Sequence, residues 1–466
     1  MKIYNTFSRK KEELVTLQPG KLGMYVCGPT VYNYIHIGNA RPFVVFDTMR
    51  KYLEYRGYKV KYIQNFTDVD DKIINRAREE GITAMDVANK YIAAYYDDVK
   101  ELNITPATVH PRVSETMPEI IAFVQGLIDK GMAYEVEGDV YYSTRKFKNY
   151  GMLSGNYIED LEVGARIPEG EKKQDPLDFA LWKAQKTPDE IAWESPWGLG
   201  RPGWHIECSA MSKKYLGETI DLHCGGQDLQ FPHHENEIAQ SEGLSGKKFS
   251  NYWMHNGFIT VDNEKMSKSL GNFFTLHDIL KEYDGEVIRY FLLSVQYRGP
   301  INFSKELMGA AESGLERMRN AKETLKHLMA NGADGEMTAE EQAKLEALGK
   351  YRESFIAHMD DDLNTADAIS DIFELIREIN TDVQGGASKA FAGEAWKLLD
   401  ELTAVLGLLR KDKEEAIDPE IQALIDERQA ARKAKDFATA DRIRDELAAR
   451  GITLKDTPQG VQIIKN

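Results

Sequence analysis

Two short segments of the chain carry residues suited to holding a triphosphate. The first, the HIGN segment, runs from His36 to Asn39 and closes the stretch Pro29–Asn39, which directly follows an apolar run that ends at Gly28. If a helix begins there, its free N–H groups and the His36 imidazole can donate to phosphate oxygens, and Gly38 permits close approach. The second, the KMSKS segment (265–269), offers Lys265 and Lys268 to stabilise charge on departing pyrophosphate. Either segment alone is also consistent with an ordinary surface loop, so the residues predict only two anion-binding loops.

A second group of residues has the chemistry of a metal site. His233 and Glu237 are four residues apart, and on a helix they would share one face. Two of only three cysteines, Cys27 and Cys208, occur beside the segments described above. Two thiolates, one imidazole and one carboxylate would complete the coordination of one Zn²⁺ ion. The chain has no CxxC motif, so a surface pair on a helix and two buried cysteines remain the alternatives.

A third candidate is the glycine-rich sequence that follows the strand-like residues 219–224. Gly225 and Gly226 would let a nucleoside approach the backbone, and the carboxylate of Asp228 could accept hydrogen bonds from ribose hydroxyls. A plain turn explains the same residues.

The elements that must position these residues form an α/β pattern. Residues 23–28 and 58–66 predict strands, and residues 41–57 between them have helical spacing. This order predicts a parallel βαβ unit, whose ligands bind at the carboxyl ends of the strands. Strand-like residues return at 219–224 and 252–261, after an aromatic and Gly/Pro-rich stretch that reads as an insertion.

Composition limits the class of protein. The chain has 466 residues, 42% hydrophobic and 29% charged, which is typical of a folded multidomain protein. It has no apolar run of about 18 residues and no apolar segment near Met1, so neither a membrane span nor a secretory signal is expected. Three cysteines cannot form a disulfide framework, which favours a reducing cytosol. The net charge of −16 argues against non-specific nucleic-acid binding, although residues 418–466 hold nine basic and nine acidic residues.

Taken together, these segments resemble the cysteinyl-tRNA synthetase family of class I aminoacyl-tRNA synthetases. The pairing of HIGN with KMSKS marks the class, although the commonest form of the first motif has His where this chain has Asn39. The likeness to the family itself rests on longer, ordered pieces: Cys27-Gly-Pro-Thr-Val-Tyr, Asn65-Phe-Thr-Asp-Val-Asp-Asp-Lys, Gly203-Trp-His-Ile-Glu-Cys-Ser, Phe231-Pro-His-His-Glu-Asn-Glu and Met359-Asp-Asp-Asp-Leu-Asn-Thr.

The resemblance implies an α/β, Rossmann-like catalytic domain interrupted by a connective insertion. It is followed by a helical bundle and a small α+β anticodon-binding module. The expected boundaries are 1–115 and 204–303 for the two catalytic halves, 116–203 for the insertion, 304–410 for the bundle and 418–466 for the module.

The resemblance also implies roles for residues. Cys27, Cys208, His233 and Glu237 would bind one zinc ion per chain. The amino-acid pocket would be formed by Gly28, Thr67, Trp204 and His233. ATP, with Mg²⁺, would contact His36, Gly38, Asn39, Gly225, Gly226, Asp228, Lys265 and Lys268. Arg432, Asp441 and Asp456 would read anticodon bases, whereas Phe437 is expected to lie in a core.

The activity implied is the ATP-dependent joining of L-cysteine to tRNA(Cys) by a cytoplasmic, monomeric enzyme. Three alternatives are weaker. A ligase joining cysteine to an amino sugar lacks a C-terminal RNA module, a zinc hydrolase leaves the KMSKS segment unexplained, and a non-catalytic paralogue leaves both intact motifs unexplained.

Overall fold

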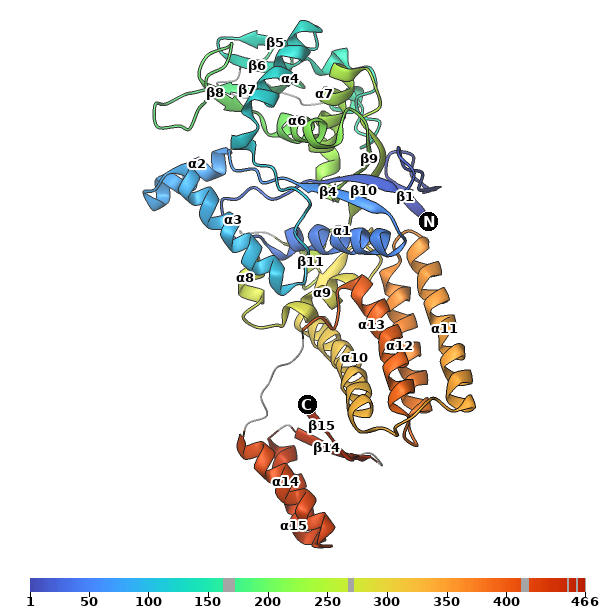
Figure 1. Cartoon of the computed structure of the whole chain (residues 1–466). Coiled ribbons are helices and arrows are strands. Elements are labelled where there is room, and N and C mark those ends of the chain that lie inside the picture. Colours follow the sequence, from blue (N-terminus) through green and yellow to red (C-terminus); the bar gives the residue numbers. More distant parts are fainter. Residues whose placement is uncertain (162–171, 267–271, 412–418, 451, 458–459, 466) are drawn as a thin grey trace. The chain divides into compact units, whose positions relative to one another are not determined.

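The computed structural model describes residues 1–161, 172–266, 272–411, 419–450, 452–457 and 460–465 (Figure 1). The chain forms two compact units. Unit 1 comprises Met1–Met308 together with Met359–Thr365, and unit 2 comprises Gly309–His358 together with Ala366–Asn466. Within the described residues, none of the helices is both long and apolar enough to cross a bilayer.

A parallel four-stranded sheet forms the centre of unit 1, in the order β10-β9-β3-β4. Its strands are β3 (Lys21–Val26), β4 (Lys59–Gln64), β9 (Ile220–Gly226) and β10 (Ser250–Asn256). The predicted βαβ unit is confirmed, and the insertion separates β4 from β9 along the chain. The predicted strand 252–261 is in fact two strands, because the chain leaves this sheet after Asn256 and joins another at β11 (Ile259–Val261).

Helix α1 (Ile37–Tyr55) is the crossover between β3 and β4. It begins at the HIGN segment, where the sequence predicts a helix start, and thus four residues before the helical spacing of 41–57. His36 is its N-cap: Nδ1 of His36 accepts a hydrogen bond from the Asn39 amide at 3.2 Å, and Oδ1 of Asn39 accepts one from the His36 amide. Most of the helix is buried. The sequence pattern therefore located the helix, and the cap fixed where it begins.

The insertion carries an antiparallel sheet of β5 (Ala133–Val136), β6 (Asp139–Tyr142), β7 (Phe179–Ala184) and β8 (Gly200–Pro202). Figure 1 shows this sheet beside α4 (Met117–Asp129), α6 (Trp204–Leu216) and α7 (Glu235–Ser245). One hydrophobic cluster joins these elements and includes Trp182, Phe123, Ile206 and Ile238. The helices that carry Cys208 and Glu237 are therefore held by the insertion as well as by the central sheet.

The other elements of unit 1 surround this core. They are β1 (Lys2–Asn5), β2 (Lys10–Glu13), α2 (Asp71–Glu80), α3 (Ala84–Glu101), α5 (Ile158–Leu161), β12 (Glu264–Lys265), α8 (Leu276–Ile279), α9 (Gly285–Leu293) and β13 (Ile301–Phe303), with short irregular helices at Val113–Glu115, Thr144–Lys146, Gln227–Leu229 and Gln230–His234. Strands β12, β11 and β13 form a second sheet, in which β11 pairs in parallel with β13.

Unit 2 is almost entirely helical, as the sequence predicts. It contains α10 (Lys305–Asn331), α11 (Ala339–Asp360), α12 (Thr365–Asp382) and α13 (Lys389–Leu406). The first residues of α10 and α12 and the last residues of α11 belong to unit 1. The apolar residues Ile369, Ile372 and Ile376 lie buried on one face of α12. The C-terminal module consists of α14 (Pro419–Lys433), α15 (Phe437–Ala449) and an antiparallel hairpin of β14 (Ile452–Thr457) and β15 (Gly460–Lys465), with Ile425, Ile443 and Leu447 in its core.

Candidate active site and metal centre

The carboxyl ends of the central strands place several site residues together. Cys27 and Gly28 follow β3, Asn65 and Thr67 follow β4, and Gly225 and Gly226 end β9. Since the strands are parallel and adjacent, these residues lie along one edge of the sheet. The Cys27 amide also donates to the carbonyl of Cys224 on β9, at 3.2 Å.

Four predicted zinc ligands converge at this edge. The ligand atoms of Cys27, Cys208, His233 and Glu237 all lie within 4.8 Å of one another, and all four residues are buried. The two Sγ atoms are 3.9 Å apart, Sγ of Cys27 is 3.7 Å from Oε1 of Glu237, and that oxygen is 3.1 Å from Nε2 of His233. Two Zn–S bonds of about 2.3 Å at a tetrahedral angle give an S–S separation of about 3.8 Å. The donor set and its spacing therefore fit Zn²⁺.

A second group of possible ligands, Cys27, His223, His234 and Glu237, shares two members with the first. Its contacts are those of hydrogen bonds. Nε2 of His223 lies 2.8 Å from Oε2 of Glu237, and Nε2 of His234 lies 3.3 Å from Sγ of Cys27 but 4.0 Å from Oε1 of Glu237. These spacings are less regular than those of the first group. His223 and His234 are therefore better described as hydrogen-bond partners that orient the predicted metal ligands Glu237 and Cys27.

The other two ligands have comparable partners. Nδ1 of His233 faces Nδ1 of His205 at 3.0 Å, and Sγ of Cys208 lies 3.8 Å from Oδ1 of Asn65. Sequence reasoning missed the roles of His205, His223, His234 and Asn65. Two signals were available: His205, His234 and Asn65 lie inside the quoted family segments, and His223 lies on the strand that ends at Gly226.

The electrostatics of the cluster favour binding a cation. The hydrogen bond from Cys27 and the proximity of His233 lower the pKa of Cys208 to about 6, whereas burial and the Cys208 contact hold the pKa of Cys27 well above its usual value. Burial opposes ionisation of Glu237, but His223 and His233 lower its pKa to about 2. Burial likewise opposes protonation of His233, yet hydrogen bonds to Cys208 and Glu237 raise its pKa to about 10. A thiolate and a carboxylate thus share one imidazolium, with a second thiol beside them.

The predicted amino-acid pocket surrounds this cluster. The Gly28 amide donates to Oδ1 of Asn65 at 3.0 Å, and a Cβ at Gly28 would lie 1.6 Å from the Asn65 carbonyl oxygen, so glycine is required there. The Thr67 hydroxyl donates to Oε2 of the buried Glu207 at 3.1 Å. Trp204 is 42% exposed, and its ring lies 4.4 Å from that of His233. Trp204 is therefore a partly exposed aromatic residue beside His233 and does not lie in the core.

Most of the residues predicted to bind ATP lie near the helix and strand ends described above. His36 caps α1, and because its Nδ1 accepts from the Asn39 amide, its Nε2 carries the proton and can donate to a phosphate. A Cβ at Gly38 would lie 2.9 Å from Nδ1 of His36, which explains the glycine. Asp228 is exposed, just beyond Gly225 and Gly226 at the end of β9. Lys265 lies in β12, and Lys268 lies outside the described residues.

The predicted anticodon readers lie on three elements of the C-terminal module. Arg432 is exposed on α14, Asp441 on α15 pairs with Arg444 at 2.9 Å, and Asp456 belongs to β14. The expectation that Phe437 is a core residue was wrong. It is the first residue of α15 and is 62% exposed, because the apolar face of that helix is formed by Ala440, Ile443 and Leu447.

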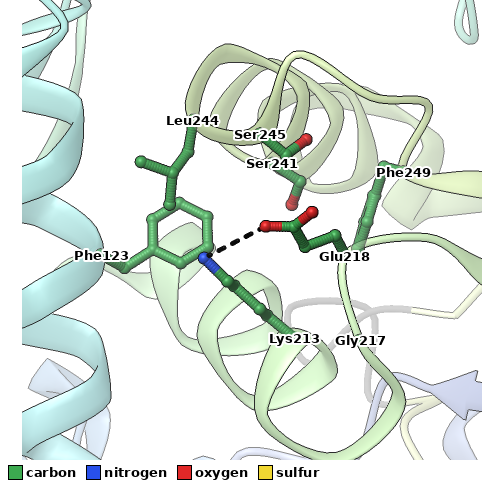
Figure 2. Close-up of a pocket in the computed structure, with 8 residues that line it drawn as sticks. All are labelled: Phe123, Lys213, Gly217, Glu218, Ser241, Leu244, Ser245 and Phe249. Atoms are coloured by element: carbon green, nitrogen blue, oxygen red, sulfur yellow. Dashed lines mark ion pairs between the residues drawn. The ribbon is translucent and has the colours of Figure 1, made fainter.

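A small hollow elsewhere in unit 1 is not this site (Figure 2). It is lined by Phe123, Lys213, Gly217, Glu218, Ser241, Leu244, Ser245 and Phe249, and Lys213 and Glu218 form an ion pair 4.0 Å long. None of the predicted site residues lines it.

Fold and site together define a class I aminoacyl-tRNA synthetase, and comparisons with known proteins agree. Residues 13–313 match the family model for the class I (C) tRNA synthetase catalytic domain, and residues 354–410 match the DALR domain. Methionyl-tRNA synthetase of Mycobacterium tuberculosis, in complex with methionyl-adenylate, aligns with 83% of this chain and 89% of its own, at 14% identity and a TM-score of 0.57. The LeuRS of Agrobacterium radiobacter K84, in a ternary complex, aligns with 84% of this chain and 85% of its own, at 12% identity and a TM-score of 0.59. At such identities these likenesses show the shared fold.

Two further matches identify the family within this class. Residues 414–463 match the cysteinyl-tRNA ligase anticodon-binding domain. A cysteine–tRNA ligase of Clostridioides difficile (strain 630) is 58% identical over 462 residues, which cover 99% of both chains. The chain belongs to the cysteinyl-tRNA synthetase family.

Proposed function

We propose that this chain activates L-cysteine with ATP, forming cysteinyl-adenylate and pyrophosphate, and then transfers cysteine to the 3′ end of tRNA(Cys). The observation that carries this proposal is the convergence of two thiols, an imidazole and a carboxylate at the carboxyl end of the central sheet. The chain leaves β3 at this end and continues into α1, the helix that begins at the HIGN segment. The match to an anticodon-binding domain favours a tRNA substrate over an amino sugar.

Zinc is the cofactor that best suits Cys27, Cys208, His233 and Glu237. When bound, it supplies strong affinity for a substrate thiolate, whereas an alkoxide from serine is much harder to form. A purely hydrophobic pocket separates near-isosteres by only about 1–3 kcal/mol. Selection at the metal would therefore make a separate editing site unnecessary.

The chain's own residues position the reactants for adenylation. Trp204 closes the pocket over His233, and the hydroxyl of Thr67, held by Glu207, faces the amino acid. As the cysteine carboxylate attacks the α-phosphorus, Nε2–H of His36 and the first amides of α1 donate to phosphate oxygens. Lys265, Lys268 and an ATP-bound Mg²⁺ neutralise the departing pyrophosphate, and Gly225, Gly226 and Asp228 hold the adenosine.

The C-terminal module is proposed to bind the anticodon. Unpaired RNA bases are recognised by stacking and by hydrogen bonds to their edges. The exposed ring of Phe437 suits stacking, and Arg432, Asp441 and Asp456 offer polar groups of both signs. We expect the enzyme to act as a monomer in the cytoplasm.

The decisive experiment is ATP–pyrophosphate exchange with cysteine, and with serine as the control, before and after zinc removal. Cysteine should stimulate exchange by the zinc-loaded enzyme, serine should not, and chelation should abolish the difference. A zinc-loaded protein that shows no cysteine-dependent exchange would contradict the proposal.

A further inference from the structure

Arg41 is a buried cation whose described hydrogen-bond partners are all backbone carbonyls. It lies one turn into α1 and is 0% exposed. Its Nη1 donates to the carbonyl oxygens of Gly257 and Phe258 at 2.7 and 2.9 Å, and its Nη2 donates to that of Gly299 at 2.7 Å. Burial lowers the pKa of Arg41 to about 10, so it remains charged at neutral pH. Residue 41 belongs to none of the assigned sites.

The three carbonyls belong to the point where the chain passes from one sheet to the next. Gly257 and Phe258 join β10 of the central sheet to β11, and Gly299 precedes β13, the parallel partner of β11. The two turns approach very closely: a Cβ at Gly257 would lie 2.3 Å from the Gly299 carbonyl oxygen. Carbonyl dipoles directed at one point repel each other unless a cation lies between them. The guanidinium supplies that cation, and its planar fork reaches both turns at once.

The same helix is also tied to the chain beyond the KMSKS segment. The Leu276 amide donates to the carbonyl of Ile35 at 2.7 Å, and the Ile37 amide donates to that of Phe274 at 3.3 Å. On the other side, β11 pairs with β12, which contains Lys265. Helix α1, which carries the HIGN segment, is thus bonded to the residues on both sides of 266–273.

We infer that Arg41 is a positioning residue for ATP: it sets the distance between the HIGN helix and the strand that leads into Lys265. The inference rests on the proposed function, in which both segments contact ATP. A lysine at this position would keep the charge but could not span three carbonyls on two turns. The predicted cysteine pocket and metal ligands lie on other elements, namely the ends of β3 and β4, the helices α6 and α7 and the short helix Gln230–His234. The Arg41 guanidinium bonds to none of them, so we expect cysteine and zinc binding to be less affected than ATP binding.

The test compares Arg41→Lys with Arg289→Lys in cysteine-dependent ATP–pyrophosphate exchange. Arg289 is also 0% exposed and also holds α1, through Asp47 and Thr48. Its guanidinium also donates to the carbonyls of Leu102 and Asn103, so it ties α1 to a different segment from Arg41. We expect Arg41→Lys to lower kcat/KM for ATP about 10–100-fold, since small misplacements of catalytic groups have effects of this size. KM for cysteine and zinc content should change less than about twofold. Arg289→Lys should lower the urea midpoint of unfolding without changing KM for ATP.

A second variant reaches the same turns without altering the cation. Gly257→Ala places a methyl group against Gly299, so it should reproduce the ATP-selective defect. The proposal is overturned if Arg41→Lys impairs ATP and cysteine equally, if it behaves like Arg289→Lys, or if it fails to fold where Arg289→Lys folds. Absence of cysteine-dependent exchange in the unmodified enzyme would instead refute the proposed function.

Discussion

Unit 1 contains two buried clusters of charged groups that are built on opposite principles. In one, the Asp47 carboxylate forms ion pairs with Arg289, at 2.7 Å, and with Lys51, and accepts a hydrogen bond from the Thr105 amide at 3.0 Å. The Arg289 guanidinium also donates to the carbonyls of Leu102 and Asn103. In the other, Cys27, Cys208 and Glu237 share the imidazole of His233, so acidic ligands are in excess. In the first cluster the chain itself supplies the cations that its carboxylate requires. In the second, the acidic groups exceed the one imidazole, and a bound cation would offset the excess.

This difference separates a structural site from a functional one. Both clusters are buried, and both contain ion pairs, so burial and pairing alone do not distinguish them. What distinguishes them is whether the chain supplies all the charge that its ionised groups require. The following variants test that distinction, beginning with the largest expected effect.

Replacing one metal ligand should remove the function of the second cluster. Cys208→Ala leaves three ligands, so we expect bound zinc to fall well below one per chain. Losing a hydrogen-bond partner of a metal ligand typically lowers metal affinity or activity about 10–100-fold. Losing the ligand itself should lower the rate of cysteine-dependent exchange by more than that. Metal analysis and exchange assays measure both. Near-normal zinc content in this variant would show that Cys208 is not a ligand.

Removing one partner from the cluster around Asp47 should lower the free energy of unfolding and leave zinc binding unchanged. Arg289→Met leaves the Asp47 carboxylate with an incomplete set of partners, and breaking a buried pair costs about 3–5 kcal/mol. Urea unfolding should show this loss while zinc content stays at one per chain. A loss of zinc at temperatures where the variant is folded would mean that the two clusters are not independent.

Removing a hydrogen-bond partner of a ligand should have an intermediate effect. His223→Phe deletes the contact to Oε2 of Glu237, and we expect zinc affinity to fall about 10–100-fold. Competition with a chelator measures the affinity. His110→Phe is the matched control, because His110 is a half-buried histidine of unit 1 that bonds only to backbone, at Gln64 and Ala107. It should leave zinc affinity unchanged.

The metal-free enzyme should show a characteristic dependence of stability on pH. The pKa of Cys208 is lowered from 9.0 to about 6, so its contribution is complete above pH 9 and is lost as the pH falls through about 6. The pKa of His233 is raised from 6.5 to about 10, so its contribution is complete below pH 6.5 and is lost as the pH rises through about 10. Between pH 6.5 and 9 the two slopes cancel.

We therefore expect a plateau of stability between those limits, with losses on either side. Urea midpoints of the chelator-treated, unmodified protein, measured from about pH 5 to about pH 10, would reveal it. A midpoint that rises or falls steadily between pH 6.5 and 9 would contradict this pairing of thiolate and imidazolium.

The sequence was informative where chemistry and local pattern coincide. The strands before Cys27 and after Gly57 were predictable because short apolar runs closed by turn residues have few alternatives. The ligands Cys27, Cys208, His233 and Glu237 were identified through the family motifs, and the structure brings them together. No spacing rule links residues 27, 208 and 233, because their proximity depends on the order of strands in the sheet.

Features that depend on tertiary contacts escaped the sequence. The predicted strand-like stretch 252–261 changes sheets at Gly257, where the Gly257 carbonyl accepts a hydrogen bond from Arg41, a long-range contact that has no signal in the local sequence. Phe437 was assigned to a core because aromatic residues usually pack, yet α15 turns a different face inward. The histidines around the metal ligands carry no periodic signal at all, since each comes from a different element.

The first six residues of the chain are linked to the predicted metal site through a series of side-chain contacts, which their sequence does not suggest. Oγ1 of Thr6 lies 2.8 Å from Nδ1 of His255, whose Nε2 lies 2.8 Å from Nδ1 of His234, which in turn faces the sulfur of Cys27. Deleting residues 1–6, or fusing another protein to them, would thus disturb this series of contacts, which ends at the predicted metal ligand Cys27. Purification tags are better attached at the other extremity, and a preparation shortened at its beginning should be checked for zinc before its turnover is compared with that of the intact enzyme.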